Sequence, residues 1–310
     1  MSEDNCREPY SVAKNNFSRA NSPTEALPNI KTLSSESEEL ITFLKSMTRS
    51  TIENIDPFYE DITFEESLRL QINKKIDLTK ALQNPHLVIP KVKFNFELLK
   101  HADTAFGWYQ LFVYIAEWAR GIPQFRMLKS VDQERLFHLN FATLSIPFSY
   151  FLVSDLQKFK DLVSSADYFK STKHIGKNDL LMMSKKLIET YEIHLIDICL
   201  KLKPDDEEMA LGMTLMLFQF SESLSNEGHL ICSKYKEKLY TALYEYQMIK
   251  FADKTELERI QRYTMLMELM HRVTKIWSEE CEYHLILSTF DETNVDGLLK
   301  KLLFTECLNT

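Results

Sequence analysis

The sequence has few of the residues that interrupt helices and no cluster of the kind that binds zinc. Six glycines and nine prolines in 310 residues leave few positions for tight turns or kinks. Long amphipathic segments rich in leucine, methionine, lysine and glutamate dominate instead, and they predict an all-α fold. The five cysteines, at positions 6, 199, 232, 281 and 307, stand singly, without a C-x-x-C pair or a dense disulfide pattern. We therefore expect reduced intracellular thiols and no metal site.

A positive charge excess and a membrane-spanning run are also missing. The formal net charge is −8 and the pI is near 5.6, which argues against a nucleic-acid footprint over the whole surface. The chain opens without a basic and then apolar leader, and no apolar run approaches the roughly 20 residues that span a bilayer. We expect no direct nucleic-acid binding by this chain and no membrane association. Proteins and apolar small molecules are the expected partners.

What the sequence does contain is enough apolar material for one large domain preceded by a tail. Hydrophobic residues make up 45% of the chain, so a sizeable core is possible. Residues 1–34 are polar, contain Pro9, Pro23 and Pro28, and lack periodicity, which predicts a disordered tail or hinge remnant. Residues 35–310 are expected to form the domain.

Apolar spacing of three to four residues predicts most of the helices. Capping-box patterns start helices at Ser35, with Glu38, and after Thr63, with Glu66. Pro85 and Pro90 should keep the next stretch extended. Longer helices are expected at 93–120, 132–153, 179–202, 211–220, 227–247 and 256–288. The helix at 132–153 is apolar on nearly all faces and should be central, with a kink at Pro147.

The most distinctive stretch is residues 118–137, W-A-R-G-I-P-Q-F-R-M-L-K-S-V-D-Q-E-R-L-F. It predicts a helix end, a break at Gly121 and Pro123, a short segment anchored by Phe125 and Leu128, and a new helix near Asp132. Any helical protein can place a proline turn between buried helices. Here, however, the whole pattern is similar to the signature of the nuclear receptor ligand-binding domain. The residues that carry it are Trp118, Pro123, Phe125, Leu128, Asp132, Gln133 and Leu136.

The resemblance covers most of residues 35–310 and is weakest before residue 90. It implies a three-layer antiparallel helical sandwich of about 11–12 helices, in a transcription regulator of the nucleus, with a cytoplasmic pool as a further option. The altered sites resemble the divergent receptors expanded in nematodes, which are related to the hepatocyte nuclear factor 4 and retinoid X type. Receptors of this family usually carry two four-cysteine zinc modules. We expect no zinc DNA-binding domain in this chain.

The C-terminal residues 303–308 resemble the family's activation helix, in which two apolar residues, any residue, a glutamate and two apolar residues follow one another. Glu306 would cap the free N–H groups of a coactivator helix, and Arg120, at the position of the family's clamp lysine, would bind its free carbonyls. A match without gaps from Asp296 instead places Lys301 where the glutamate belongs, and both registers remain open. The groove residues implied are Arg120, Gln133, His138, Leu303, Phe304, Glu306 and Leu308.

A ligand pocket is implied by the same resemblance. Its residues map to Thr104, Ala105, Trp108, Ser145, Phe148, Leu152, Cys281 and His284. Family members that bind carboxylic acids have an arginine where Leu152 stands, and an unpaired carboxylate in an apolar pocket is costly. We therefore expect a neutral lipophilic ligand or none, and no other cofactor. From its spacing alone, His284 is more typical of a core or surface histidine than of a ligand contact.

Dimerisation is expected by analogy alone. The very long helix at 256–288 carries a stripe that would pair with another receptor in a homo- or heterodimer, although such stripes are commonly core. Its residues are Arg262, Leu266, Met267, Leu269 and Met270. The acidic run Asp205 to Glu208 is interpreted as a helix cap only.

Three functions follow in order of preference. The first is a ligand-binding domain that regulates transcription by recruiting coactivator or corepressor proteins. The second is a ligand-independent dimerisation or corepressor module of the same fold. The third is a helical lipid carrier or enzyme, although no G-x-S-x-G, H-E-x-x-H, P-loop or Rossmann motif is present. A non-enzymatic role is expected.

Overall fold

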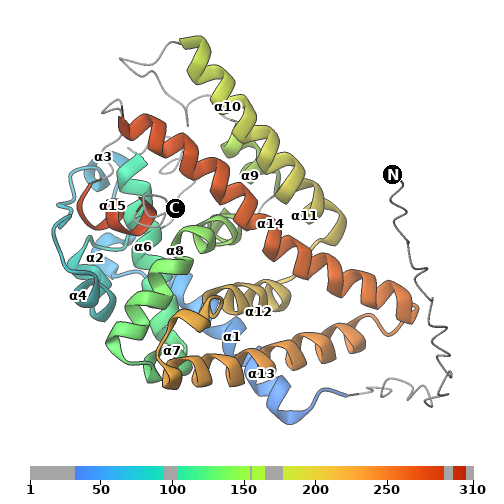
Figure 1. Cartoon of the computed structure of the whole chain (residues 1–310). Coiled ribbons are helices and arrows are strands. Elements are labelled where there is room, and N and C mark those ends of the chain that lie inside the picture. The colour runs from blue at the N-terminus through green and yellow to red at the C-terminus, as the bar shows by residue number, and fades with distance from the viewer. Residues whose placement is uncertain (1–31, 94–103, 154–155, 165–176, 290–295, 305–310) are drawn as a thin grey trace, which may run out of the picture.

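The computed structural model describes residues 32–93, 104–153, 156–164, 177–289 and 296–304. These residues form helices joined by short connections, without a strand among them, as the glycine-poor sequence predicts (Figure 1). The short elements are α2 (Pro57–Glu60), α3 (Phe64–Ser67), α4 (Leu78–Gln83), the 3-10 turn η1 (Pro85–Leu87), α7 (Pro123–Met127), α9 (Leu156–Ser164), the π turn η3 (Glu192–Ile196), α11 (Asp197–Leu202), the 3-10 turn η4 (Ser221–Ser223) and α15 (Gly297–Phe304).

The long helices pack in three layers. The first contains α1 (Ser35–Glu53) and α6 (Thr104–Gly121); the second contains α8 (Ser130–Val153), α12 (Asp206–Leu217) and α13 (Asn226–Lys250); the third contains α10 (Lys177–Tyr191) and α14 (Glu256–Thr289). The middle helices α8 and α12 contact both outer layers. The predicted all-α sandwich is therefore confirmed.

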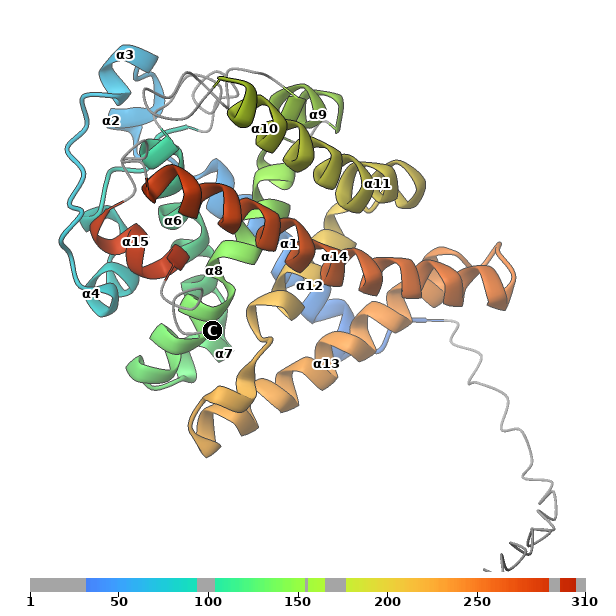
Figure 2. The same ribbon diagram turned by 45° about the horizontal axis from the view of Figure 1, so that its top comes forward.

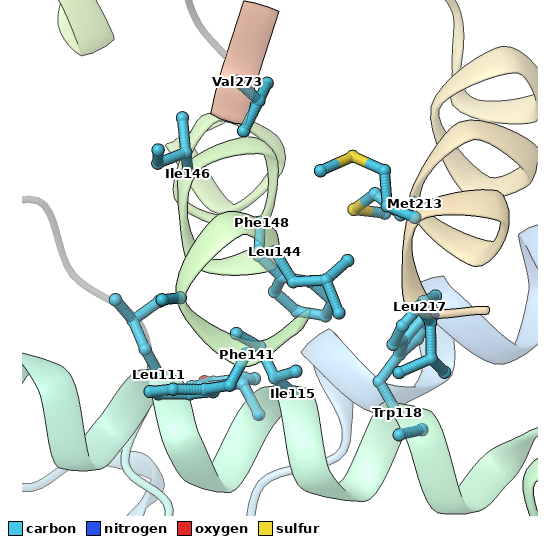
Figure 3. Packing of buried hydrophobic residues seen from close by; sticks show 14 of the residues in the cluster. Leu111, Ile115, Trp118, Phe141, Leu144, Ile146, Phe148, Met213, Leu217 and Val273 are labelled. Atoms are coloured by element: carbon cyan, nitrogen blue, oxygen red, sulfur yellow. The ribbon is translucent and has the colours of Figure 1, made fainter. Parts of the chain in front are cut away.

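Helix α8 is the centre of the core, as its apolar faces predict. Phe137, Phe141 and Phe148 are fully buried, and the rings of Phe112 and Phe137 meet edge to face with centroids 5.6 Å apart. Figure 3 shows side chains of α8 between those of α6 and α12. Pro147 lies inside α8 without ending it.

The signature residues brace the junction of α6, α7 and α8. The indole N–H of Trp118 donates to Thr48 Oγ1 of α1 over 2.9 Å. Asp132 is buried and accepts from the backbone N–H and the hydroxyl of Ser225, at 2.9 and 2.5 Å. The Gln133 amide donates to the Leu128 carbonyl, which closes the α7–α8 turn. Phe125, Leu128 and Leu136 fill the core around this junction, and Pro123 begins α7.

Several expected boundaries change. The N-cap of α1 is Ser34, whose hydroxyl accepts from Ser37 N–H, so the expected Ser35–Glu38 box is wrong by one position. The Thr63–Glu66 box is present, but α3 ends at Ser67. The stretch expected to be extended contains η1. Residues 1–31 and 94–103 lie outside the described residues.

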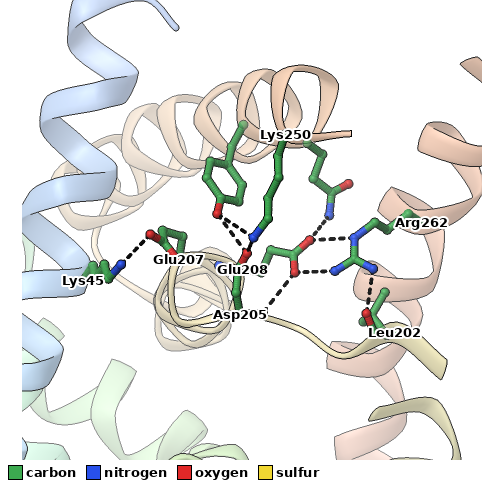
Figure 4. A network of polar contacts seen from close by, with 9 residues as sticks. Lys45, Leu202, Asp205, Glu207, Glu208, Lys250 and Arg262 are labelled. Carbon is green, nitrogen blue, oxygen red and sulfur yellow. Dashed lines mark hydrogen bonds and ion pairs between the residues drawn. The ribbon is translucent and has the colours of Figure 1, made fainter. Parts of the chain in front are cut away.

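The acidic run before α12 does more than cap the helix. Asp205 and Glu208 form the expected capping box. However, Glu208 is fully buried, and Arg262 of α14 binds both its carboxylate oxygens, at 2.9 and 2.6 Å. The Gln247 amide of α13 donates to the same carboxylate, and Arg262 also donates to the carbonyl of Leu202 (Figure 4). The interpretation as a cap alone was wrong, because this carboxylate joins α11, α12, α13 and α14.

Replacing Arg262 with alanine should destabilise the domain by about 3–5 kcal/mol, because Glu208 would remain buried without its partner. The measurement is the free energy of unfolding by urea titration, followed by circular dichroism. The matched control is Arg272→Ala, which removes an arginine of the same helix from a partly exposed pair with Glu268 and should cost less than about 1 kcal/mol. Equal effects of the two changes would contradict a dominant role of the buried pair.

Candidate functional site

Helix α15 is docked on the body of the domain. It packs against α8, α6 and α14, and Leu298, Leu299, Leu302, Leu303 and Phe304 are all buried. Its apolar face therefore completes the core at this end of the molecule.

The start of α15 is fastened to a segment ahead of α4. Lys74 contributes its carbonyl, which accepts from Leu298 N–H over 2.9 Å, and its ammonium, which lies 3.2 Å from Asp296 Oδ1. The Tyr109 hydroxyl of α6 donates to the Asp296 carbonyl. Gly297 has φ +55°, and a Cβ there would lie 2.0 Å from the Lys74 carbonyl oxygen. Only glycine fits this contact.

Helix α15 contains the second of the two registers expected for the C-terminus, the one that starts at Asp296. Its sequence L-L-K-K-L-L places Lys301 at the glutamate position of the activation-helix pattern, and Lys300 and Lys301 are exposed. Leu303 and Phe304 belong to the same helix. Glu306 and Leu308 lie outside the described residues, so their role stays a prediction.

The other expected groove residues lie along α6 and α8. Arg120 is exposed in the last turn of α6. Gln133 and His138 are half-buried in the first part of α8, although Gln133 also serves the α7–α8 turn. A surface between the end of α6 and the start of α8 is thus present, with Arg120 at one end.

A second group of predicted residues meets between α6 and α14. The ring of Trp108 lies 5.8 Å from that of His284 and 6.0 Å from that of Trp277, edge to face in both cases. The middle helix α8 also reaches this group, because the ring of Phe141 lies 6.1 Å from that of Trp108. Ala105 is buried on the same helix as Trp108. The side chain of Thr104 lies outside the described residues.

His284 is a buried polar group without a hydrogen bond. It is 1% exposed, and neither ring nitrogen has a hydrogen-bonding partner among the described residues. The nearest carboxylate, Glu280, is also buried, lies 3.8 Å away and accepts from the Tyr191 hydroxyl. Cys281 contacts the Leu303 carbonyl of α15 over 4.0 Å. An uncompensated buried imidazole is costly, and such groups mark functional sites.

The predicted pocket residues of α8 do not all join this group. Phe148 packs on Trp118, with ring centroids 5.5 Å apart, towards α12 (Figure 3). The Ser145 hydroxyl donates to the Ala142 carbonyl within its own helix. Leu152 is buried near the end of α8. The expected contact of Phe148 with a ligand is therefore replaced by a core contact.

The predicted dimer stripe was also wrong in its residues. Leu266, Leu269 and Met270 are buried within the protomer, Met267 is partly buried against the same core, and Arg262 is held by Glu208. Leu266, Leu269 and Met270 therefore fill the interior of the protomer, whereas Met267 and Arg262 are partly exposed. An exposed apolar surface lies next to them instead, lined by Tyr240, Tyr244, Ile260 and Tyr263 of α13 and α14.

The sequence reasoning missed a strap, residues 77–92, that lies on α6. Lys91 is buried and its ammonium binds the Glu117 carboxylate over 2.5 Å. Gln110 donates to the Pro90 carbonyl and accepts from Val92 N–H. The Tyr114 hydroxyl donates to the Val92 carbonyl. The available signal was the pair of polar residues, Gln110 and Glu117, inside an otherwise apolar helix.

Within the described residues, no group of three or more histidine, cysteine, aspartate or glutamate side chains is arranged to hold a metal ion. A search of those residues for a helix long and apolar enough to cross a membrane found none.

Comparison with known proteins agrees with this architecture. Residues 95–290 match the family model described as the ligand-binding domain of nuclear hormone receptor. The chain belongs to the nuclear hormone receptor ligand-binding domain family. Members of this family are generally ligand-regulated transcription factors.

Two curated relatives come from Caenorhabditis elegans. Nuclear hormone receptor family member nhr-4 is 26% identical over 172 residues, which is 54% of this chain and 34% of the relative. Family member nhr-100 is 22% identical over 231 residues, 71% of this chain and 52% of the relative. The aligned part thus spans between a third and about half of these receptors. The expected nematode-type divergence is confirmed.

Replacing His284 with phenylalanine should stabilise the ligand-free domain by about 1 kcal/mol, because it removes two unpaired buried nitrogens and keeps a ring against Trp108. The measurement is the urea midpoint. The control His271→Phe changes an exposed histidine of the same helix and should stay within about 0.5 kcal/mol of the parent protein. A clear loss of stability in His284→Phe would show that this imidazole is already hydrogen-bonded in the empty domain.

Proposed function

We propose that the domain regulates transcription in the nucleus by binding a neutral lipophilic ligand and recruiting coregulator proteins. The observation that supports the proposal is the buried imidazole of His284, which has no hydrogen bond among the described residues and lies near the docked helix α15. Cys281, three residues earlier, touches the backbone of that helix. A ligand bound in this region would therefore influence the position of α15.

The chemistry of the region favours a ligand with one polar end. Trp108 and Trp277 offer apolar surface beside His284, and His284 offers a donor and an acceptor for a hydroxyl or carbonyl group. A ligand carboxylate would lie close to the like-charged carboxylate of Glu280. It would also find no cationic partner, because Leu152 stands where carboxylate-binding receptors have an arginine. An alcohol, ketone or ester of largely apolar shape fits best.

The coregulator surface is proposed to lie between α6 and α8. An amphipathic helix bound there would have its C-terminal carbonyls near Arg120. The opposite end would lie on the side of α15, where the described helix carries Lys301 and the following residues carry Glu306. Which of these two side chains meets the bound helix decides whether the domain uses the activating clamp.

A second candidate is a ligand-independent module that dimerises or recruits corepressors. The exposed cluster of Tyr240, Tyr244, Ile260 and Tyr263 favours it, because aromatic side chains are enriched in protein interfaces. It would pair this domain with a second copy or another nuclear receptor. Sedimentation velocity of the parent protein and of Ile260→Asp distinguishes the two: dimers that the change abolishes support this surface.

The coregulator surface is tested with a fluorescent L-x-x-L-L peptide and polarisation binding, with and without a lipid extract. Arg120→Ala should weaken binding about two- to fivefold, because the C-terminus of the bound helix loses a nearby cation worth roughly 0.3–1 kcal/mol. The control Arg126→Ala removes an exposed arginine from the neighbouring helix α7 and should leave binding unchanged.

The two C-terminal registers are separated by parallel charge reversals. If the Glu306 register holds, Glu306→Lys abolishes peptide binding and Lys301→Glu has little effect. If the Lys301 register holds, Lys301→Glu strengthens binding and Glu306→Lys is neutral. Failure of the parent protein to bind with or without extract would reject the activator form of the proposal.

A further inference from the structure

Helix α4 belongs to the strap and has the pattern of a coregulator motif. Its residues Leu78-Thr79-Lys80-Ala81-Leu82 read L-x-x-A-L. This pattern differs at one position, Ala81, from the L-x-x-L-L peptide that such a surface accepts. Positions i, i+3 and i+4 share one face of a helix. Ala81 is 0% and Leu82 3% exposed, whereas Lys80 points to solvent. The helix buries the face that a coregulator would bury.

The place of α4 is the surface between α6 and α8. It packs against both helices, and in both whole-molecule views it lies on the same side as α15 (Figures 1 and 2). Burial raises the pKa of the Glu134 carboxyl on α8, next to Gln133, and the nearby negative charge of the N-cap Asp77 raises that pKa further. Residues after α4 reach Glu117, one turn before Arg120 on α6.

Helix α4 also runs in the direction expected of a bound coregulator helix. Its N-terminus follows Lys74, which holds the start of α15, and its C-terminus leads to His86, which pairs with Glu117 near the end of α6. A coregulator helix clamped between α15 and Arg120 would run the same way.

The strap is held at both ends of this surface. Burial opposes ionisation of Glu117, but hydrogen bonds from His86 and Lys91 outweigh it and lower the pKa of that carboxyl. The anchor is therefore ionised at neutral pH. At the other end, Lys74, three residues before the strap, holds the start of α15, so that movement of α15 would loosen the segment that leads into α4.

We propose that α4 is an internal occupant of the coregulator surface, which an incoming L-x-x-L-L helix must displace. This inference rests on the proposed coregulator function and adds its regulation. The tether gives α4 a high effective concentration, and Ala81, smaller than the leucine of an incoming motif, leaves the peptide with the better apolar contact. The apparent affinity for the peptide is then lowered, because only the small fraction of molecules in which α4 is released can bind it.

The first test compares Ala81→Arg with Gln83→Arg. The first change forces a charge under α4 and should release it, and the second adds the same charge at an exposed position of the same helix. Polarisation binding of the L-x-x-L-L peptide should become at least about tenfold tighter in Ala81→Arg, as expected when fewer than a tenth of parent molecules are open. Gln83→Arg should bind like the parent protein.

The second test uses the parent protein alone and so does not depend on how a variant folds. Saturating peptide should raise hydrogen exchange of the amides of residues 78–84, while amides of α11, which packs on η3 and α14, keep their protection. Peptide that binds with α4 still protected would overturn the inference and leave the coregulator function standing. If the peptide binds neither the parent protein nor Ala81→Arg with α4 released, the coregulator function fails as well.

Discussion

The buried ion pair between Glu208 and Arg262 is the contact on which the arrangement of the third layer depends. A carboxylate without solvent is tolerated only with full hydrogen bonding, and here α12, α13 and α14 all contribute to it. The ion pair fixes the position of α14 along its own helix axis. Because α14 is one continuous helix, the same constraint places His284, about 33 Å further along, against Trp108 of α6.

The two ends of α14 therefore differ in their packing and hydrogen bonding. At the Arg262 end both carboxylate oxygens of Glu208 have partners, and the packing is that of a structural core. At the His284 end α6, α8 and α14 meet through aromatic rings, and the imidazole has no hydrogen bond among the described residues. Proteins retain such costly groups where function needs them. The structural end and the binding end of the domain are thus built from one helix.

The sequence predicted the parts of the fold that local pattern controls. The proline break and the helices around it follow from Gly121, Pro123 and the spacing of apolar residues, and the structure has them. The dimer stripe failed because periodicity shows that Leu266 and Met270 share a face without showing which neighbour covers it. The cap interpretation of Glu208 failed for a similar reason, since its partner Arg262 lies 54 residues away.

The C-terminus and the strap show a second limit. Residues 296–308 contain two overlapping apolar patterns, and local spacing alone cannot choose between Lys301 and Glu306. Helix α4 is six residues long, too short for periodicity to stand out, and the two prolines that follow it predicted extended chain. Its stability comes from tertiary contacts with α6 and α8, as is general for short helices.

The central claim is that coregulator and α4 compete for one surface of α6 and α8. The most direct measurement is the methyl NMR signal of Ala81, buried in the free domain, during titration with an L-x-x-L-L peptide. The account predicts that this signal moves to the position of an exposed, unstructured alanine in proportion to the bound fraction. A peptide that saturates the domain while the Ala81 signal stays unchanged would contradict it.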